Sequence, residues 1–222
     1  AETSLLFDIQ KEVGNRDQYK ADLKGFSDVQ ANLDTPEATA LKQKLGSLKQ
    51  EEVKPLLEGL TAYSQYAHGT HVAGTIAQTT NNGLGAAGLA HQSCLMPVKV
   101  LDKSGSGSYS AVSNGIRFAA DNGAKVINLS LGGSASSATL ENAVKYAYEK
   151  GVTVVAAAGN SDSSTPSYPA AYDAYVISVG ATRYDEKLAS YSNFGSSLDV
   201  VAPGGDLAVD QNNDGYGDGV LQ

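Results

Sequence analysis

The spacing of apolar residues divides the chain at about residue 66 into two parts with different periods. In the first part leucines recur four and three residues apart, at Leu41, Leu45 and Leu48, the amphipathic pattern of a helix. Thr35-Pro36-Glu37 precedes them and is a good helix start, with Thr as N-cap and Pro at the first helical position. Pro55 is expected to limit a second helix. The pattern predicts a helix-rich extension over residues 1–66, and a pro-segment or an interaction arm are the functional alternatives.

From residue 67 onward, short apolar runs alternate with segments of helical spacing. The predicted strands are 95–101, 125–131, 152–158, 175–179 and 198–202. The predicted helices are a small-residue helix that opens at about residue 68, and 109–122 and 137–150. This order indicates an α/β fold, a doubly wound, mostly parallel sheet with helices on both faces, with residues 67–222 forming a partial domain of this kind. The near-continuous apolar run at 152–158 is typical of a strand covered on both faces.

The composition of the chain limits the kinds of binding partner, disulfide and membrane segment that it can have. The 222 residues carry a formal net charge of −8, which argues against nucleic acid and anionic membrane surfaces as partners. Cys94 is alone, so no disulfide forms within the chain. No apolar run is long enough to span a bilayer, and Ala1 does not open a signal peptide. An exported protein of this sequence would therefore have lost its signal.

Glycine and small polar residues gather where the predicted strands end. Ser130-Leu131-Gly132 follows one strand, Ala157-Ala158-Gly159-Asn160 ends the next, and Gly105-Ser106-Gly107 follows a third. Such segments leave a trough in which another chain can lie against exposed backbone. Asn160 would be an amide donor where an oxyanion develops, or simply an asparagine in a turn. His68 would be a general base presented beside Gly69 on a rigid helix, or a capping or core-edge histidine.

Gly83-Leu84-Gly85-Ala86-Ala87-Gly88 matches the glycine pattern of dinucleotide-binding loops. That motif requires a strand before it and a helix after it, whereas here a helix precedes and a strand follows. The sequence therefore argues against a nucleotide site.

Six motifs in order carry a family resemblance. They are His68-Gly69-Thr70-His71-Val72-Ala73-Gly74, Val98-Lys99-Val100-Leu101-Asp102, Asn128-Leu129-Ser130-Leu131-Gly132-Gly133, Val154-Val155-Ala156-Ala157-Ala158-Gly159-Asn160, Tyr168-Pro169-Ala170 and Val201-Ala202-Pro203-Gly204. Over about residues 67–204 the chain resembles the subtilisin-like serine proteases, and their thermitase-like branch in particular. The resemblance implies a secreted, monomeric endopeptidase that cleaves extended polypeptides through a Ser/His/Asp mechanism.

The resemblance also implies roles for individual residues. His68 matches the catalytic base and Asn160 the oxyanion donor. One backbone rim of the family's substrate cleft is matched by Gly105, Ser106 and Gly107. The opposite rim is matched by Ser130, Leu131 and Gly132. Ala157 and Gly159 match the floor of the primary specificity pocket, and Tyr168-Pro169 matches a cis peptide bond of the family.

Calcium is a separate expectation. Asp210, Asn212, Asp214 and Asp218 occupy positions 1, 3, 5 and 9 of an EF-hand-like loop, although Leu221 stands where position 12 requires Glu. A solvated acidic loop is the alternative. By resemblance, Asn82 would give a side-chain oxygen to a family calcium site.

Two members of the triad are not visible in the sequence. Asp8, after Leu5-Leu6-Phe7, is the least unsuitable candidate for the orienting aspartate, and no Gly-Thr-Ser-Met-Ala segment supplies the nucleophile. We therefore expect a truncated and inactive form of the peptidase, or alternatively a non-catalytic peptide-binding module. Missing core elements would leave apolar surface uncovered, so self-association is an alternative to a monomer.

Overall fold

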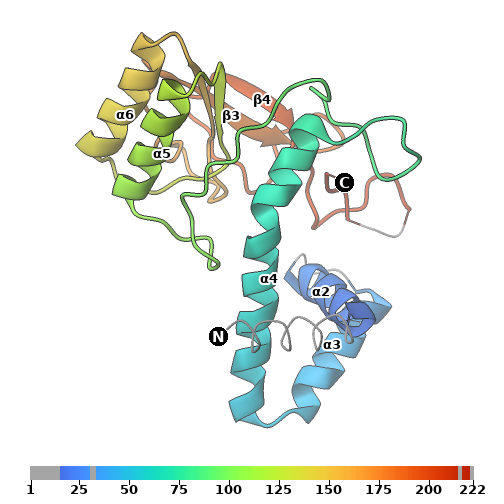
Figure 1. Cartoon of the computed structure of the whole chain (residues 1–222). Coiled ribbons are helices and arrows are strands. Elements are labelled where there is room, and N and C mark those ends of the chain that lie inside the picture. Colours follow the sequence, from blue (N-terminus) through green and yellow to red (C-terminus); the bar gives the residue numbers. More distant parts are fainter. Residues whose placement is uncertain (1–15, 31–33, 215–216, 221–222) are drawn as a thin grey trace. The chain divides into compact units, whose positions relative to one another are not determined.

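The computed structural model describes residues 16–30, 34–214 and 217–220 (Figure 1). They belong to two compact units, one of Ala1–Ser64 and Leu207–Gly217 and the other of Gln65–Asp206 and Asp218–Gln222. The predicted functional division at residue 66 stays a prediction. None of the helices described is long and apolar enough to cross a membrane.

The described part of the first unit contains three helical segments. Helix α2 covers Arg16–Gln30, α3 covers Pro36–Ser47, and the 28-residue helix α4, Gln50–Ala77, begins here. As predicted, Thr35 caps α3: its hydroxyl oxygen accepts from the Ala38 N–H at 3.1 Å. Leu41 of α3 is buried, in agreement with its place in the predicted leucine stripe. Local capping and an amphipathic stripe thus account for α3.

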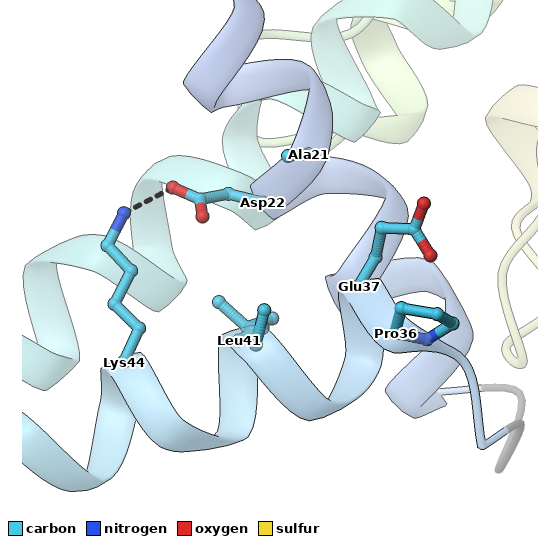
Figure 2. Close-up of a pocket in the computed structure, with 7 residues that line it drawn as sticks. Ala21, Asp22, Pro36, Glu37, Leu41 and Lys44 are labelled. Carbon is cyan, nitrogen blue, oxygen red and sulfur yellow. Dashed lines mark hydrogen bonds and ion pairs between the residues drawn. The ribbon is translucent and has the colours of Figure 1, made fainter.

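A pocket of about 410 Å³ lies between α2 and α3 (Figure 2). An ion pair crosses it, with Lys44 Nζ 2.5 Å from a carboxylate oxygen of Asp22. The other lining residues are Ala21, Pro36, Glu37, Ala40 and Leu41. None of the residues predicted to act on a substrate lines this pocket, so it is not the predicted cleft.

Helix α4 differs from the prediction. We expected Pro55 to limit one helix and another to open near His68, but a single helix runs from Gln50 to Ala77 with Pro55 inside it. Pro55 is the sixth residue of this helix, beyond its first turn, so its missing N–H costs one intrahelical hydrogen bond, and the helix continues past it nevertheless. Gly69 does not end the helix, because a single interior glycine costs only about 1 kcal/mol relative to alanine. His68 therefore lies within a helix and not at its mouth.

A parallel sheet forms the centre of the second unit. Its strands are β1 (Val126–Leu129), β2 (Thr153–Ala157), β3 (Val176–Thr182) and β4 (Val200–Pro203), in the spatial order β1-β2-β3-β4. All three pairings are parallel. Helices α5 (Tyr109–Asp121) and α6 (Ala138–Glu149) run side by side (Figure 1) and close the unit's main core. The predicted α/β class is confirmed.

Burial alternates along β1, β2 and β3, whereas every residue of β4 is exposed. Val154 and Ala156 of β2 are buried, whereas Thr153 and Ala157 are exposed. On the same principle Val126 is 60% exposed. The apolar run at 152–158 thus does not mark a strand buried on both faces, because the cluster formed with α5 and α6 covers only the alternate residues.

The segment 95–101 is the second difference from the prediction. It belongs to no strand of the sheet, although Val98 and Val100 are partly buried against the core. These valines approach Gly115 of α5 so closely that a Cβ there would lie 2.4 Å from Val100 Cγ1. Side-chain packing on α5 therefore holds this segment, without the backbone ladder that defines a strand.

Candidate active site

The predicted base is attached to the predicted rim. His68 is an exposed residue of α4, and its Nε2 lies 2.8 Å from the carbonyl oxygen of Ser130. A carbonyl only accepts hydrogen bonds, so Nε2 carries a proton in this arrangement. No carboxylate of the described residues pairs with this ring. As placed, His68 donates to the rim, and acting as a base at Nε2 would require the other tautomer.

Strand register brings two of the predicted segments to one edge of the sheet. Leu129 is the partner of Ala156 in the parallel β1–β2 pair. Ser130 and Ala157 therefore leave the two strands at the same, carboxyl-terminal edge, where ligands of open α/β sheets bind. Sequence spacing predicted this juxtaposition.

A tight turn organises the first rim. The Ser106 N–H donates to Asp102 Oδ1 at 3.1 Å, and the Gly105 N–H donates to the Asp102 carbonyl at 3.1 Å. Hydrogen bonds from the Ser104 hydroxyl, and from the Ser106 and Ser104 amides, hold the pKa of Asp102 below its ordinary value. The Gly107 N–H has no partner among the described residues. Gly107 is thus the rim amide open to a bound chain.

Tyr109 links the two rims, which sequence reasoning missed. The Tyr109 hydroxyl donates to the Ala135 carbonyl at 2.7 Å. A Cβ on Gly133 would lie 2.5 Å from the hydroxyl oxygen of Tyr109. Gly133 follows the second rim directly, and Tyr109 is two residues beyond Gly107. The sequence signal was an aromatic residue at the first position of α5.

The second rim continues into the next loop. Leu131 packs against the core, and a Cβ on Gly132 would lie 3.0 Å from Ser167 Cβ. Gly133 and Tyr168 exchange two backbone hydrogen bonds of 2.9 Å. The Tyr168-Pro169 bond is cis, as predicted.

The residues predicted to form the pocket floor stand at the end of β2 and just after it. Ala157 is exposed, and Gly159 has φ of +116°, a conformation that side-chain-bearing residues rarely adopt. A Cβ on Gly159 would also lie 2.5 Å from Asn193 Nδ2. Asn160 is exposed, and its carboxamide makes no hydrogen bond to another described residue. It is therefore available to a ligand.

The residues predicted to bind calcium belong to both units of the chain. Asp210 Oδ1 and Asn212 Oδ1 accept from the Asp214 N–H at 3.2 and 2.9 Å. In the second unit the Asp218 carbonyl accepts from the Asp206 N–H. In the described part of the chain, no three His, Cys, Asp or Glu residues form a group suited to a metal ion.

The remaining predicted site residues are Asn82 and Asp8. Asn82 Oδ1 accepts from the Leu84 N–H at 3.0 Å, which leaves one lone pair for a cation. Asp8, the candidate for the orienting aspartate, lies outside the described residues.

Several known proteases are similar to this chain. Thermitase of Thermoactinomyces vulgaris is 52% identical over 137 residues, 62% of this chain and 49% of thermitase. Halolysin of Haloferax mediterranei is 61% identical over 137 residues, 62% of this chain and 26% of halolysin. A solved protease structure from Pseudoalteromonas arctica aligns with a TM-score of 0.58 at 36% identity, over 68% of this chain and 50% of that one.

The chain spans half or less of the length of these relatives. Residues 34–219 match the sequence model of the subtilase family, Peptidase S8. That match covers most of the chain and includes both rims, His68 and Asn160. The chain belongs to the subtilase family.

Proposed function

We propose that this chain binds an extended polypeptide in the trough between the rims 105–107 and 130–132, as a secreted endopeptidase of the subtilisin type does with its substrate. The observation that carries the proposal is the pair of glycine rims joined through Tyr109, with the Gly107 amide open. An extended peptide can add its backbone to such an edge, and main-chain hydrogen bonds then give affinity without regard to sequence.

The chemistry expected of the site follows from its donors. A peptide carbonyl beside Asn160 would accept from the exposed carboxamide, and the preceding side chain would lie over Ala157 and Gly159. His68 would take the proton from an attacking serine hydroxyl and later deliver it to the leaving amine. We propose that the 222-residue chain on its own binds without turnover, because no family nucleophile segment is present in it.

Peptide affinity tests the trough. A Cβ at Gly107 would lie 2.4 Å from the Val100 carbonyl oxygen, so Gly107→Ala and Gly107→Pro both introduce this contact, and the proline ring also restricts Ser106. Only the proline variant also loses the amide donor. We expect Gly107→Pro to bind a fluorescent extended peptide roughly tenfold more weakly than Gly107→Ala, the worth of about one hydrogen bond. Equal dissociation constants would remove the Gly107 amide from the trough, and no binding by the parent chain would end the proposal.

A second candidate function is a non-catalytic peptide-binding module. One observation favours it: His68 Nε2 donates to the Ser130 carbonyl, which is a structural use of the ring. Both candidates expect no turnover by the 222-residue chain on its own, so the sequence encoded after Gln222 separates them: a Gly-Thr-Ser-Met-Ala segment there would supply the nucleophile of a peptidase. Hydrolysis of a fluorogenic peptide by the 222-residue chain itself, abolished by a serine-directed phosphonate, would contradict both candidates.

We also propose that the 210–214 turn binds calcium. Its donors are carboxylate and amide oxygens, which calcium prefers, and two of them already converge on the Asp214 N–H. Calorimetric titration with calcium of the parent chain and of Asp210→Asn tests this. The proposal expects heat of binding that the substitution weakens, with magnesium as the control. If the parent chain shows no heat of calcium binding, the 210–214 turn is a solvated acidic loop and the proposal fails.

A further inference from the structure

We infer that Asn193 is a positioning residue, which fixes the strand-end loop 158–165 and thereby holds Asn160 and the pocket floor toward a bound peptide. The inference rests on the proposed function, since it assigns to Asn193 the placement of that site. Asn193 lies between β3 and β4, 28 to 35 residues after the residues of the loop that it contacts.

Burial makes the side chain of Asn193 costly unless its polar atoms are satisfied. The residue is 1% exposed. A buried amide without partners costs about 1–3 kcal/mol by mutational measures, so its hydrogen bonds determine whether the site is stable. Within the described residues, the hydrogen bonds of this carboxamide go to residues 158–167.

The hydrogen bonds of Asn193 fall on both sides of Asn160. Before it, Asn193 Nδ2 donates to the Ala158 carbonyl at 3.0 Å, and the Asn193 backbone N–H donates to the Gly159 carbonyl at 3.0 Å. After it, Asn193 Oδ1 accepts from the Ser161 N–H at 2.8 Å. Asn160 is thus the exposed residue between three anchored neighbours.

Two more contacts close the loop over the same side chain. Asn193 Oδ1 also accepts from the Ser163 N–H at 3.1 Å, and Nδ2 donates to the Thr165 carbonyl at 3.3 Å. The loop is therefore wrapped around one carboxamide, which satisfies both its donors and its acceptors.

Backbone bonds hold the two segments together independently of that side chain. The Asp162 N–H donates to the Tyr191 carbonyl at 2.9 Å, and the Phe194 N–H donates to the Ser163 carbonyl at 2.8 Å. Removal of the Asn193 carboxamide should thus loosen the loop without detaching it. That separation makes a positioning role testable.

Ser192 provides a matched control. It is equally buried, at 1% exposure, and its hydroxyl accepts from the Ala181 N–H at 2.9 Å and donates to the Asn193 carbonyl at 3.1 Å. None of these side-chain bonds reaches the loop 158–165. Ser192→Ala therefore removes buried hydrogen bonds from the neighbouring position and leaves the loop's carboxamide in place.

The experiment compares the 222-residue parent with Asn193→Ala, Asn193→Asp and Ser192→Ala. Amide hydrogen exchange is measured for residues 158–165 and for β2. We expect Asn193→Ala to speed exchange in the loop about tenfold or more relative to β2, because each lost bond to a buried group is worth about that factor. Ser192→Ala should leave this ratio unchanged. Asn193→Asp keeps an oxygen that accepts from the Ser161 N–H, so the Ser161 amide should stay protected from exchange. If Asn193→Ala does not fold, Asn193→Asp takes its place in the comparison.

Peptide selectivity supplies a readout that a merely structural role would not move. Two extended peptides are used, identical except for a large or a small side chain over the pocket floor. The affinity ratio of the pair should shrink in Asn193→Ala and not in Ser192→Ala. Equal loop exchange and equal ratios in these two variants would overturn the inference. A parent that binds neither peptide would end the proposed function, while the exchange measurement would still decide whether Asn193 holds the loop.

Discussion

Replacement of Ser178 by alanine is expected to stabilise the protein. Ser178 lies in β3 with 0% exposure, and its Oγ has no hydrogen-bond partner in the part of the chain that the structure describes. Its backbone is satisfied separately, since the Ser178 N–H donates to Asp199 Oδ2 at 2.7 Å. The free-energy cost of burial therefore falls on the hydroxyl group alone. Alanine removes this oxygen and keeps the Cβ.

The magnitude follows from the cost of an unsatisfied buried hydroxyl. Mutational data place that cost at about 1–3 kcal/mol, and the small void left by one oxygen returns part of it. We expect the free energy of unfolding to rise by about 1 kcal/mol. Ser192→Ala should have the opposite sign, since Ser192 Oγ makes two hydrogen bonds at nearly the same burial.

Urea unfolding followed by far-ultraviolet circular dichroism measures both variants. With a slope of about 2 kcal/mol per molar urea, a gain of about 1 kcal/mol moves the midpoint upward by about 0.5 M. The reasoning fails if Ser178→Ala lowers the midpoint as Ser192→Ala does. That result would mean that the Ser178 hydroxyl has a partner, such as an ordered internal water.

Three further variants test the trough. Tyr109→Phe should lower the free energy of unfolding by about 1 kcal/mol and weaken peptide binding, because the hydrogen bond to Ala135 is lost; unchanged peptide affinity would separate this tyrosine from the rims. Gly159→Ala should cost about 2 kcal/mol or more in urea unfolding, since its positive φ and its close neighbours both oppose a side chain; a neutral result would contradict the loop geometry. The carboxyl of Asp102 has a lowered pKa, so its support of the turn is present above the ordinary aspartate pKa and is lost as pH falls through the lowered value. In NMR titration the Ser106 amide shift should therefore change below the usual aspartate range, and Asp102→Asn should abolish this transition.

The elements that the sequence predicted well are those whose signals are local. Helix α6 begins after Ser137, whose hydroxyl caps it, and ends before Gly151 as expected. The strands β2 and β3 are short, β-branched and bounded by turns. By contrast, 95–101 has the composition of a strand, but pairing depends on a neighbour that no local pattern reports.

In the candidate site, too, the residues with a local sequence signal were predicted and those that depend on distant partners were not. The glycine rims and Asn160 stand out because strand ends concentrate small and polar residues. Tyr109 and Asn193 do not, because the side-chain partner of Tyr109 lies 26 residues away in the chain and those of Asn193 lie 26 to 35 residues away. A buried asparagine between two strands has no distinctive local pattern, so only the folded chain reveals what it holds.

The half-exposed face of the sheet bears on how stability changes with temperature. Val126, Ile177 and Val200, which share one face of the sheet by strand register, are already 60, 40 and 50% exposed in the native state. Unfolding therefore hydrates less new apolar surface at these positions than it would from a fully covered sheet. Since newly exposed apolar area sets the heat-capacity increase, the stability curve of this unit should be flatter than that of a subtilase sheet covered on both faces.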